Sequence, residues 1–299
     1  MKDFPIPVVA FGPGSQPEDE TLDYLPMPQG MATYRAPALP EPEEIAERAA
    51  AHRALRATLH ALDAVRQDGS QRQVPLQGLG ADDLALVNQV LGEGEVSARV
   101  TEHPDSLLGQ AGRELRIQES VFAGVWRVMT LVDGQLVDDA VEVGHIPAAL
   151  EAAARADVAA RMAPPLPEPL PPEVMNSPML LTELEDQWQR WQPGQPPHVI
   201  NLSLLPMSGA DIGFLDHQLG TGRVLILSRG YGNCRITNTT MPNCWRVVYY
   251  NSQDTVILNT VEVVGLPEVA CAAAADLHDS HERLHEVLQW VEGALEPVQ

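Results

Sequence analysis

The feature that most limits how this chain can fold is an internal repeat, because similar segments adopt similar structures. Several short motifs occur twice, in the same order, in the two halves of the chain. They are Gly80-Ala81-Asp82 with Gly209-Ala210-Asp211, Leu91-Gly92-x-Gly94-x-Val96 with Leu219-Gly220-x-Gly222-x-Val224, Arg116-Ile117 with Arg235-Ile236, Trp126-Arg127-Val128 with Trp245-Arg246-Val247, and Val141-Glu142-Val143 with Val261-Glu262-Val263. From the Trp to the Glu the spacing is 16 residues in the first copy and 17 in the second. We therefore expect two tandem related units.

The residue pattern of each copy predicts a short helix, then several strands and then a second helix that begins at a proline. The strand prediction uses alternation and β-branched content, and covers 95–100, 125–132, 224–227, 245–250 and 256–263. Short turns such as Asp133-Gly134 and the segment 251–254 favour antiparallel neighbours. The predicted fold class is α+β, with two units of antiparallel sheet and flanking helices on one side, which leave the other face of the sheet and its edges available to a partner.

Proline clusters predict where packed structure stops, because proline fixes φ and removes a backbone donor. The first cluster predicts an extended arm over residues 1–42, and the second, rich in consecutive prolines, a stiff linker over 163–178. The predicted domains are then a first unit at 43–162, which begins with a helix over 43–67, and a second unit at 179–299.

The charge balance excludes some functions. Lys plus Arg number 19 and Asp plus Glu 41, a formal net charge of −22, so the chain repels phosphate and a general nucleic-acid or anionic-membrane binder is not expected. No uninterrupted run of 18 apolar residues and no signal-like start occur. The three cysteines are too few for a disulfide framework. We expect a cytoplasmic protein with no membrane insertion.

One motif in the second copy suggests metal chemistry. His281-Glu282-x-x-His285 matches the helical H-E-x-x-H pattern of zinc hydrolases, and His278 lies one turn earlier. The extended form of that motif would need a Gly at Leu288 and a His at Val291. His281 also falls within an apolar stripe, so the alternative is a histidine at the border of a packed helix. A zinc-dependent hydrolase remains the rival function.

The segment from Arg229 to Arg235 suggests binding. Gly230 and Gly232 flank Tyr231 and permit close backbone approach ahead of Asn233 and Cys234, although a tight turn before a strand explains the same pattern. Cys234 and Cys244 frame a possible hairpin that could bring two thiols together for redox or metal chemistry. The first copy has Leu115 and Val125 at the matching positions, so cysteines that fill small apolar positions are the simpler interpretation. No nucleophile elbow, P-loop or dinucleotide motif occurs. We expect no catalytic residue, metal or cofactor.

The second copy as a whole resembles the HupH/HyaF family of hydrogenase expression and formation proteins. The resemblance is carried by the segments 229–236, 245–252 and 257–263, and by Ala274-Ala275-Asp276-Leu277-His278-Asp279-Ser280. In the arm it is carried by Gly12-Pro13-Gly14-Ser15-Gln16. It covers nearly the whole chain, with a looser match in the first copy.

This resemblance implies a non-catalytic maturation factor for uptake [NiFe] hydrogenases. Such a factor acts in the cytoplasm on the iron–sulfur small-subunit precursor, notably under oxygen, and works with other hydrogenase maturation proteins. A second alternative is a scaffold that joins those proteins without touching the small subunit. The residues that we expect near the partner are Arg229, Gly230, Tyr231, Gly232, Asn233, Cys234, Arg235, Trp245 and Asn251. Whether Cys234 contacts an immature cluster stays open.

Overall fold

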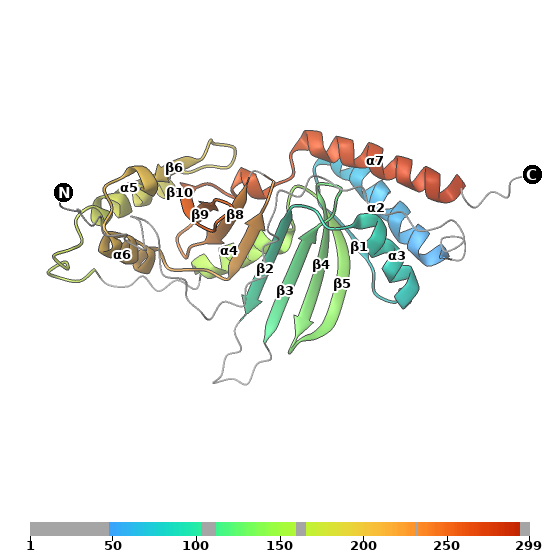
Figure 1. Cartoon of the computed structure of the whole chain (residues 1–299), viewed down its shortest axis with the longest axis horizontal. Helices are drawn as coiled ribbons and strands as arrows, with labels where there is room; N and C mark the ends of the chain where they lie inside the picture. The colour runs from blue at the N-terminus through green and yellow to red at the C-terminus, as the bar shows by residue number, and fades with distance from the viewer. Residues whose placement is uncertain (1–47, 103–111, 160–165, 231, 294–299) are drawn as a thin grey trace, which may run out of the picture.

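One antiparallel sheet of ten strands runs through both halves of the chain (Figure 1). A computed structural model describes residues 48–102, 112–159, 166–230 and 232–293. The strand order is β1-β5-β4-β3-β2-β7-β8-β9-β10-β6, and every ladder is antiparallel. The predicted α+β class with two related antiparallel units is confirmed. The two units, however, share a single sheet.

The two copies use the same succession of elements. The first consists of α2 (Ala49–Asp68), β1 (Arg72–Pro75), α3 (Ala81–Leu91), β2 (Val96–Glu102), β3 (Arg113–Glu119), β4 (Val125–Val132), β5 (Gln135–Val143) and α4 (Ala148–Ala159). The second consists of α5 (Ser177–Arg190), β6 (His198–Asn201), the 3-10 turn η1 (Leu202–Leu204), α6 (Gly209–Leu219), β7 (Val224–Ser228), β8 (Asn233–Asn238), β9 (Cys244–Tyr250), β10 (Val256–Val263), the 3-10 turn η2 (Glu268–Ala270) and α7 (Ala274–Gly293). Among these residues no helix is long and apolar enough to cross a membrane.

The predicted strands 125–132 and 256–263 coincide with β4 and β10, and the short edge strands β1 and β6 were not foreseen. The expected helix at 43–67 is found as α2 from Ala49 onward, while its first residues, the 1–42 arm and linker residues 163–165 lie outside the described residues. Helix α5 begins at Ser177, within the last two residues of the predicted linker.

The two copies meet at strands β2 and β7, whose pairing has approximate twofold symmetry. Val96 pairs with Ser228, and the repeat counterpart of Val96, Val224, pairs with Val100. The hydrogen bonds around the junction repeat as well: Gly94 N donates to Glu119 O at 2.7 Å, and Gly222 N donates to Asn238 O at 2.8 Å. The inner edges of the two units therefore close on each other, and of the edges expected to be open only the outer ones at β1 and β6 remain.

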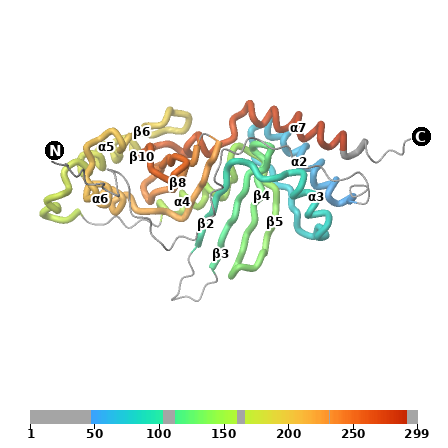
Figure 2. The backbone as a smooth tube through the Cα atoms, in the orientation of Figure 1, coloured from blue at the N-terminus to red at the C-terminus, as the bar shows by residue number. Residues whose placement is uncertain are grey.

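Each copy sends its last helix toward the other copy. Helix α7 follows the second copy but lies along α2 of the first (Figure 1), where Leu277, Leu284 and Leu288 pack in the same core as Leu55 and Leu62. Helix α4 follows the first copy and contributes Leu150 to the central core under β7, β8 and β9. Helices α5 and α6 form a third core with β9 and β10. The backbone trace shows the same interlocking (Figure 2).

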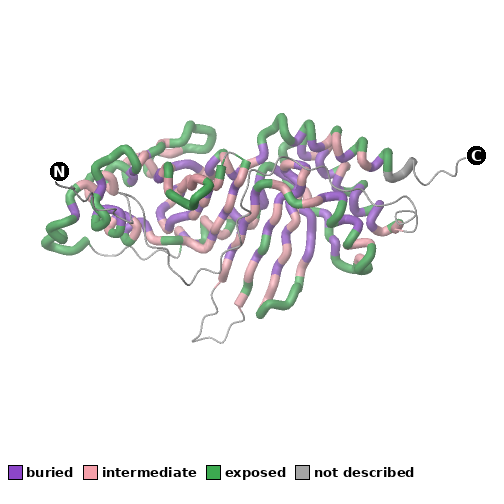
Figure 3. The backbone as a smooth tube through the Cα atoms, viewed as in Figure 1, coloured by how far each residue is buried: buried purple, intermediate pink, exposed green. Residues whose placement is uncertain are grey.

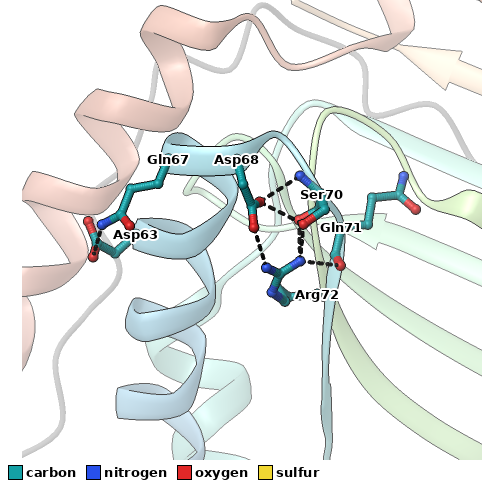
Figure 4. A network of polar contacts seen from close by, with 6 residues as sticks. All are labelled: Asp63, Gln67, Asp68, Ser70, Gln71 and Arg72. Carbon is teal, nitrogen blue, oxygen red and sulfur yellow. Dashed lines mark hydrogen bonds and ion pairs between the residues drawn. The ribbon is translucent and has the colours of Figure 1, made fainter.

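A polar network fixes the turn from α2 into the edge strand β1 (Figure 4). Gly69 ends the helix in the left-handed region, with φ at 70°. The Asp68 carboxylate accepts from Ser70 N at 2.9 Å and from the Arg72 guanidinium at 2.6 Å. These bonds, those from Ser70 first, lower the pKa of Asp68 to about 2. The charged carboxylate therefore holds the chain as it enters the sheet.

Candidate partner-binding site

The predicted binding segment lies where β7 ends and β8 begins, directly beside the first copy. Arg229 N donates to Glu95 O at 3.1 Å, and the Arg229 guanidinium donates to Gly94 O at 3.3 Å. Its counterpart at the other end of the junction is the bond from Thr101 N to Arg223 O. The segment is thus held against the residues that precede β2, and it belongs to the junction rather than to the second copy alone.

The two glycines of this segment are exposed and differ in what they require. A Cβ at Gly230 would lie 2.2 Å from the end of the Glu95 side chain, which is able to move. Gly232 has φ at +104° and open space around it, so any larger residue there is strained by its backbone alone. The two form an isolated parallel bridge with each other. Tyr231 lies outside the described residues.

Cys234 and Trp245 have their side chains in the core. Burial raises the pKa of Cys234 to about 12, so its thiol stays protonated at neutral pH. The Trp245 indole donates to Gly265 O at 3.1 Å, as Trp126 donates to Gly144 O at 2.9 Å in the first copy. Removing either buried indole costs about 3–5 kcal/mol of stability. The side chains of Cys234 and Trp245 therefore pack beneath the surface and support the strands from the core.

Three of the remaining residues are half-buried and differ in their contacts. Asn233 and Arg235 are half-buried and alternate along β8 with buried Cys234 and Ile236. Asn251 closes the β9–β10 turn, where its side-chain oxygen accepts from Gln253 N at 2.8 Å and Thr255 N at 3.0 Å. Among the expected residues with described positions, the exposed Gly230 and Gly232 are the most accessible to a partner, and half-buried Arg229, Asn233, Arg235 and Asn251 follow.

The histidine motif lies on α7, the helix that packs along α2 of the first copy. The His281 and His285 rings stack with centroids 6.4 Å apart, and His278 contacts both Arg66 and Glu282. His285 also bonds Gln289 at 2.9 Å. Across the residues with described positions, no group of three His, Cys, Asp or Glu side chains is arranged to hold a metal ion. The zinc reading gains no support from this geometry.

Residues on the neighbouring strands continue this surface and were not expected from the sequence. Arg99 and Arg116 pair across β2 and β3, Arg99 is also opposite Leu225, and Leu227 is opposite Arg235. The available signal was the repeat itself, which aligns Arg116 with Arg235. Their significance depends on the order of the strands, which brings the two copies side by side.

Both halves of the chain match one family model. The model describes the C-terminal conserved region of the HupH hydrogenase expression protein, and it matches residues 49–164 and again 174–291. Relatives over nearly the full length include the hydrogenase expression/formation protein HoxQ of Cupriavidus necator, 54% identical over 97% of this chain and 99% of the relative. HupH of Rhodobacter capsulatus is 44% identical over 97% and 98%. The hydrogenase-1 operon protein HyaF of Escherichia coli is 34% identical over 94% and 95%.

Proposed function

Because this chain belongs to the family of HupH hydrogenase expression proteins, we propose that it is a non-catalytic factor in hydrogenase maturation. Its target in this proposal is the iron–sulfur small-subunit precursor of an uptake [NiFe] hydrogenase, which it binds in the cytoplasm, notably under oxygen. The observation that carries the proposal is the family match in both copies, which covers the sheet and its helices together.

Within this proposal the contact is centred on the segment from Gly230 to Arg235, with β9 beside it. Support comes from the exposed glycine backbone, which allows another polypeptide to approach closely. The segment lies at the junction of the two copies, so a bound partner touches both. The Cys234 thiol is buried and protonated, so it packs in the core and is not proposed as a metal ligand.

Capture of the precursor from cells that express the hydrogenase operon tests the proposal. Tagged wild-type protein is expected to co-purify with the small-subunit precursor, and the Gly230→Val/Gly232→Val double variant to lose that capture. The positive φ of Gly232 strains a valine there, and the distortion is expected to stay local because no described residue lies within 4 Å of an added Cβ. Circular dichroism and the melting temperature establish whether the double variant is folded.

Gly194→Val is the matched control. Gly194 also has positive φ, at +84°, and open space around it, but it lies between α5 and β6. The Gly194→Val substitution imposes the same kind of backbone strain away from the proposed contact, so capture of the precursor is expected to persist. Unchanged capture by the Gly230/Gly232 variant would refute the placement. Capture of other maturation proteins without the precursor would favour the scaffold alternative.

A further inference from the structure

The middle of the sheet has one face that no described helix covers. This central face consists of the side of β3, β2, β7 and β8 that is opposite α4. Side chains directed into the central core, such as Ala98, Ile117 and Ile226, are buried. Their neighbours along the same strands, which point the other way, are half-exposed or exposed (Figure 3). The central face is therefore a solvent-facing surface in the described part of the chain.

Helices cover the same side of the sheet at both ends. At one end α2, α3 and α7 pack on Val125, Val141 and Val143 of β4 and β5. At the other end α5 and α6 pack on Val261 and Val263 of β10 and on β9. Figure 1 shows these helix groups at opposite ends of the sheet. The central face is the interval between two helical layers.

The side chains of the central face form an apolar centre with cations on either side. Half-exposed Leu225 and Leu227 lie on β7. Across β2, Leu225 is opposite Arg99, which is in turn opposite Arg116 on β3; across β8, Leu227 is opposite Arg235. Glu114 is the one carboxylate among the described residues of these four strands on this face, and it contacts both Arg99 and Arg116. The described residues of these four strands therefore place three guanidinium groups and one carboxylate on this face, whereas the chain as a whole has a net charge of −22.

The backbone of these strands excludes one mode of binding. Each of the four strands already has a hydrogen-bonded neighbour on both sides, so no sheet edge is open to an added strand. A helix satisfies its own backbone hydrogen bonds and needs only side-chain contacts. From β3 to β8 there are three strand spacings, about 14 Å, and a helix with its side chains is about 10–12 Å across. The width of these four strands therefore matches a single helix.

We propose that the central face binds an amphipathic helix of a partner protein whose acidic residues meet Arg99, Arg116 and Arg235 and whose apolar residues meet Leu225 and Leu227. The charge complementarity and the flanking helical layers carry this assignment. That the partner is a hydrogenase precursor rests on the proposed function above; the surface and the chemistry of its ligand do not.

A photo-crosslinking amino acid at Leu227 of the full chain tests the inference in cells that express the hydrogenase operon. The expected crosslink joins this position to an acidic helical segment of a protein encoded by that operon, identified by mass spectrometry. The same probe at Leu204, which is 81% exposed and lies outside the central face, is the matched control and is expected to give at least tenfold less of that product. A crosslink within the chain, to a second copy, or to nothing overturns the inference.

Charge reversal provides an independent variant. Arg116→Glu/Arg235→Glu is expected to lower the yield of the Leu227 crosslink at least tenfold, and added salt to weaken it in the wild type. Arg155→Glu/Arg190→Glu makes the same change in net charge at exposed ion pairs on α4 and α5 and is expected to leave the yield unchanged. Circular dichroism checks that both variants fold. An undiminished yield in the first variant overturns the inference.

The identity of the crosslinked protein separates this inference from the proposed function. A crosslink to an acidic helix of the small-subunit precursor supports both. A crosslink to such a helix in another operon protein, with no precursor captured, supports the central face and rejects the proposed target. Normal capture of the precursor by the Arg116/Arg235 variant, with an unchanged crosslink, rejects the central face and leaves the proposed function standing.

Discussion

The two ends of the β2–β7 junction occupy equivalent positions in the repeat, but their side chains differ in charge and in hydrogen bonding. At one end Arg223 precedes β7 and Asn238 ends β8; at the other, the aligned residues are Glu95 and Glu119. Asp157 of α4 reaches the first end, where it accepts from Arg223 N at 2.7 Å, Arg223 Nε at 2.5 Å and Asn238 Nδ2 at 2.9 Å. The buried carboxylate at this end is fully matched with donors.

The other end has an excess of carboxylates. Burial first, and then the charges of Glu95 and Asp276, raise the pKa of Glu119 to about 7, against backbone hydrogen bonds that lower it. The duplicated backbone has thus kept its geometry while the side chains diverged. At one end the carboxylate is paired with a guanidinium and an amide, and at the other a carboxyl group with a pKa of about 7 lies beside the Gly230 segment.

The largest effect is expected from Asp157→Ala, which breaks the matched end. The change leaves the Arg223 guanidinium and the buried Asn238 amide without their shared acceptor, at a cost of about 3–4 kcal/mol in the free energy of unfolding. Urea denaturation measures it. Asp186→Ala removes an exposed partner of Arg190 and is expected to cost less than about 0.5 kcal/mol. Equal losses in the two variants would show that the junction contact is no stronger than a surface pair.

A smaller effect of the opposite sign is expected from Glu119→Gln. The folded-state pKa of Glu119 is raised, so its contribution to stability is present below pH 4.5 and is lost as the pH rises through about 7. Gln cannot ionise, and at pH 8 the variant is expected to be more stable than the wild type by about 1–3 kcal/mol. At pH 5 the difference is expected to shrink toward zero. A difference that does not change with pH would contradict the raised pKa.

The duplicated units and many of their strands could be predicted from the sequence, whereas the contacts between the two copies could not. The L-G-x-G-x-V motifs and the two Trp-Arg-Val segments predicted duplicated units, and alternation predicted strands such as β4 and β10, because both depend on local residue patterns. The joining of β2 to β7 depends on contacts between distant segments, as does the crossing of α7 to α2. Arg223 and Glu95 flank different strands, so their contrasting environments follow only from that pairing. An available sheet face was expected, but the residues of the central face were missed for the same reason, since Arg99, Leu225 and Arg235 come together only across three strands.

The smallest effect is expected from Glu95→Gln, which tests whether neighbouring charge adds to burial at Glu119. Burial is the largest cause of the raised pKa, and Glu95 is exposed, so solvent screens its charge. The variant is expected to move the pH midpoint of the Glu119-dependent stability change downward by less than one unit, measured as unfolding free energy from pH 5 to 8. Glu93→Gln, also exposed and two residues away, is expected to leave that midpoint in place. A midpoint unchanged in the Glu95 variant would assign the raised pKa of Glu119 to burial and Asp276, whereas a shift of more than one unit would make charge repulsion across the junction the leading cause.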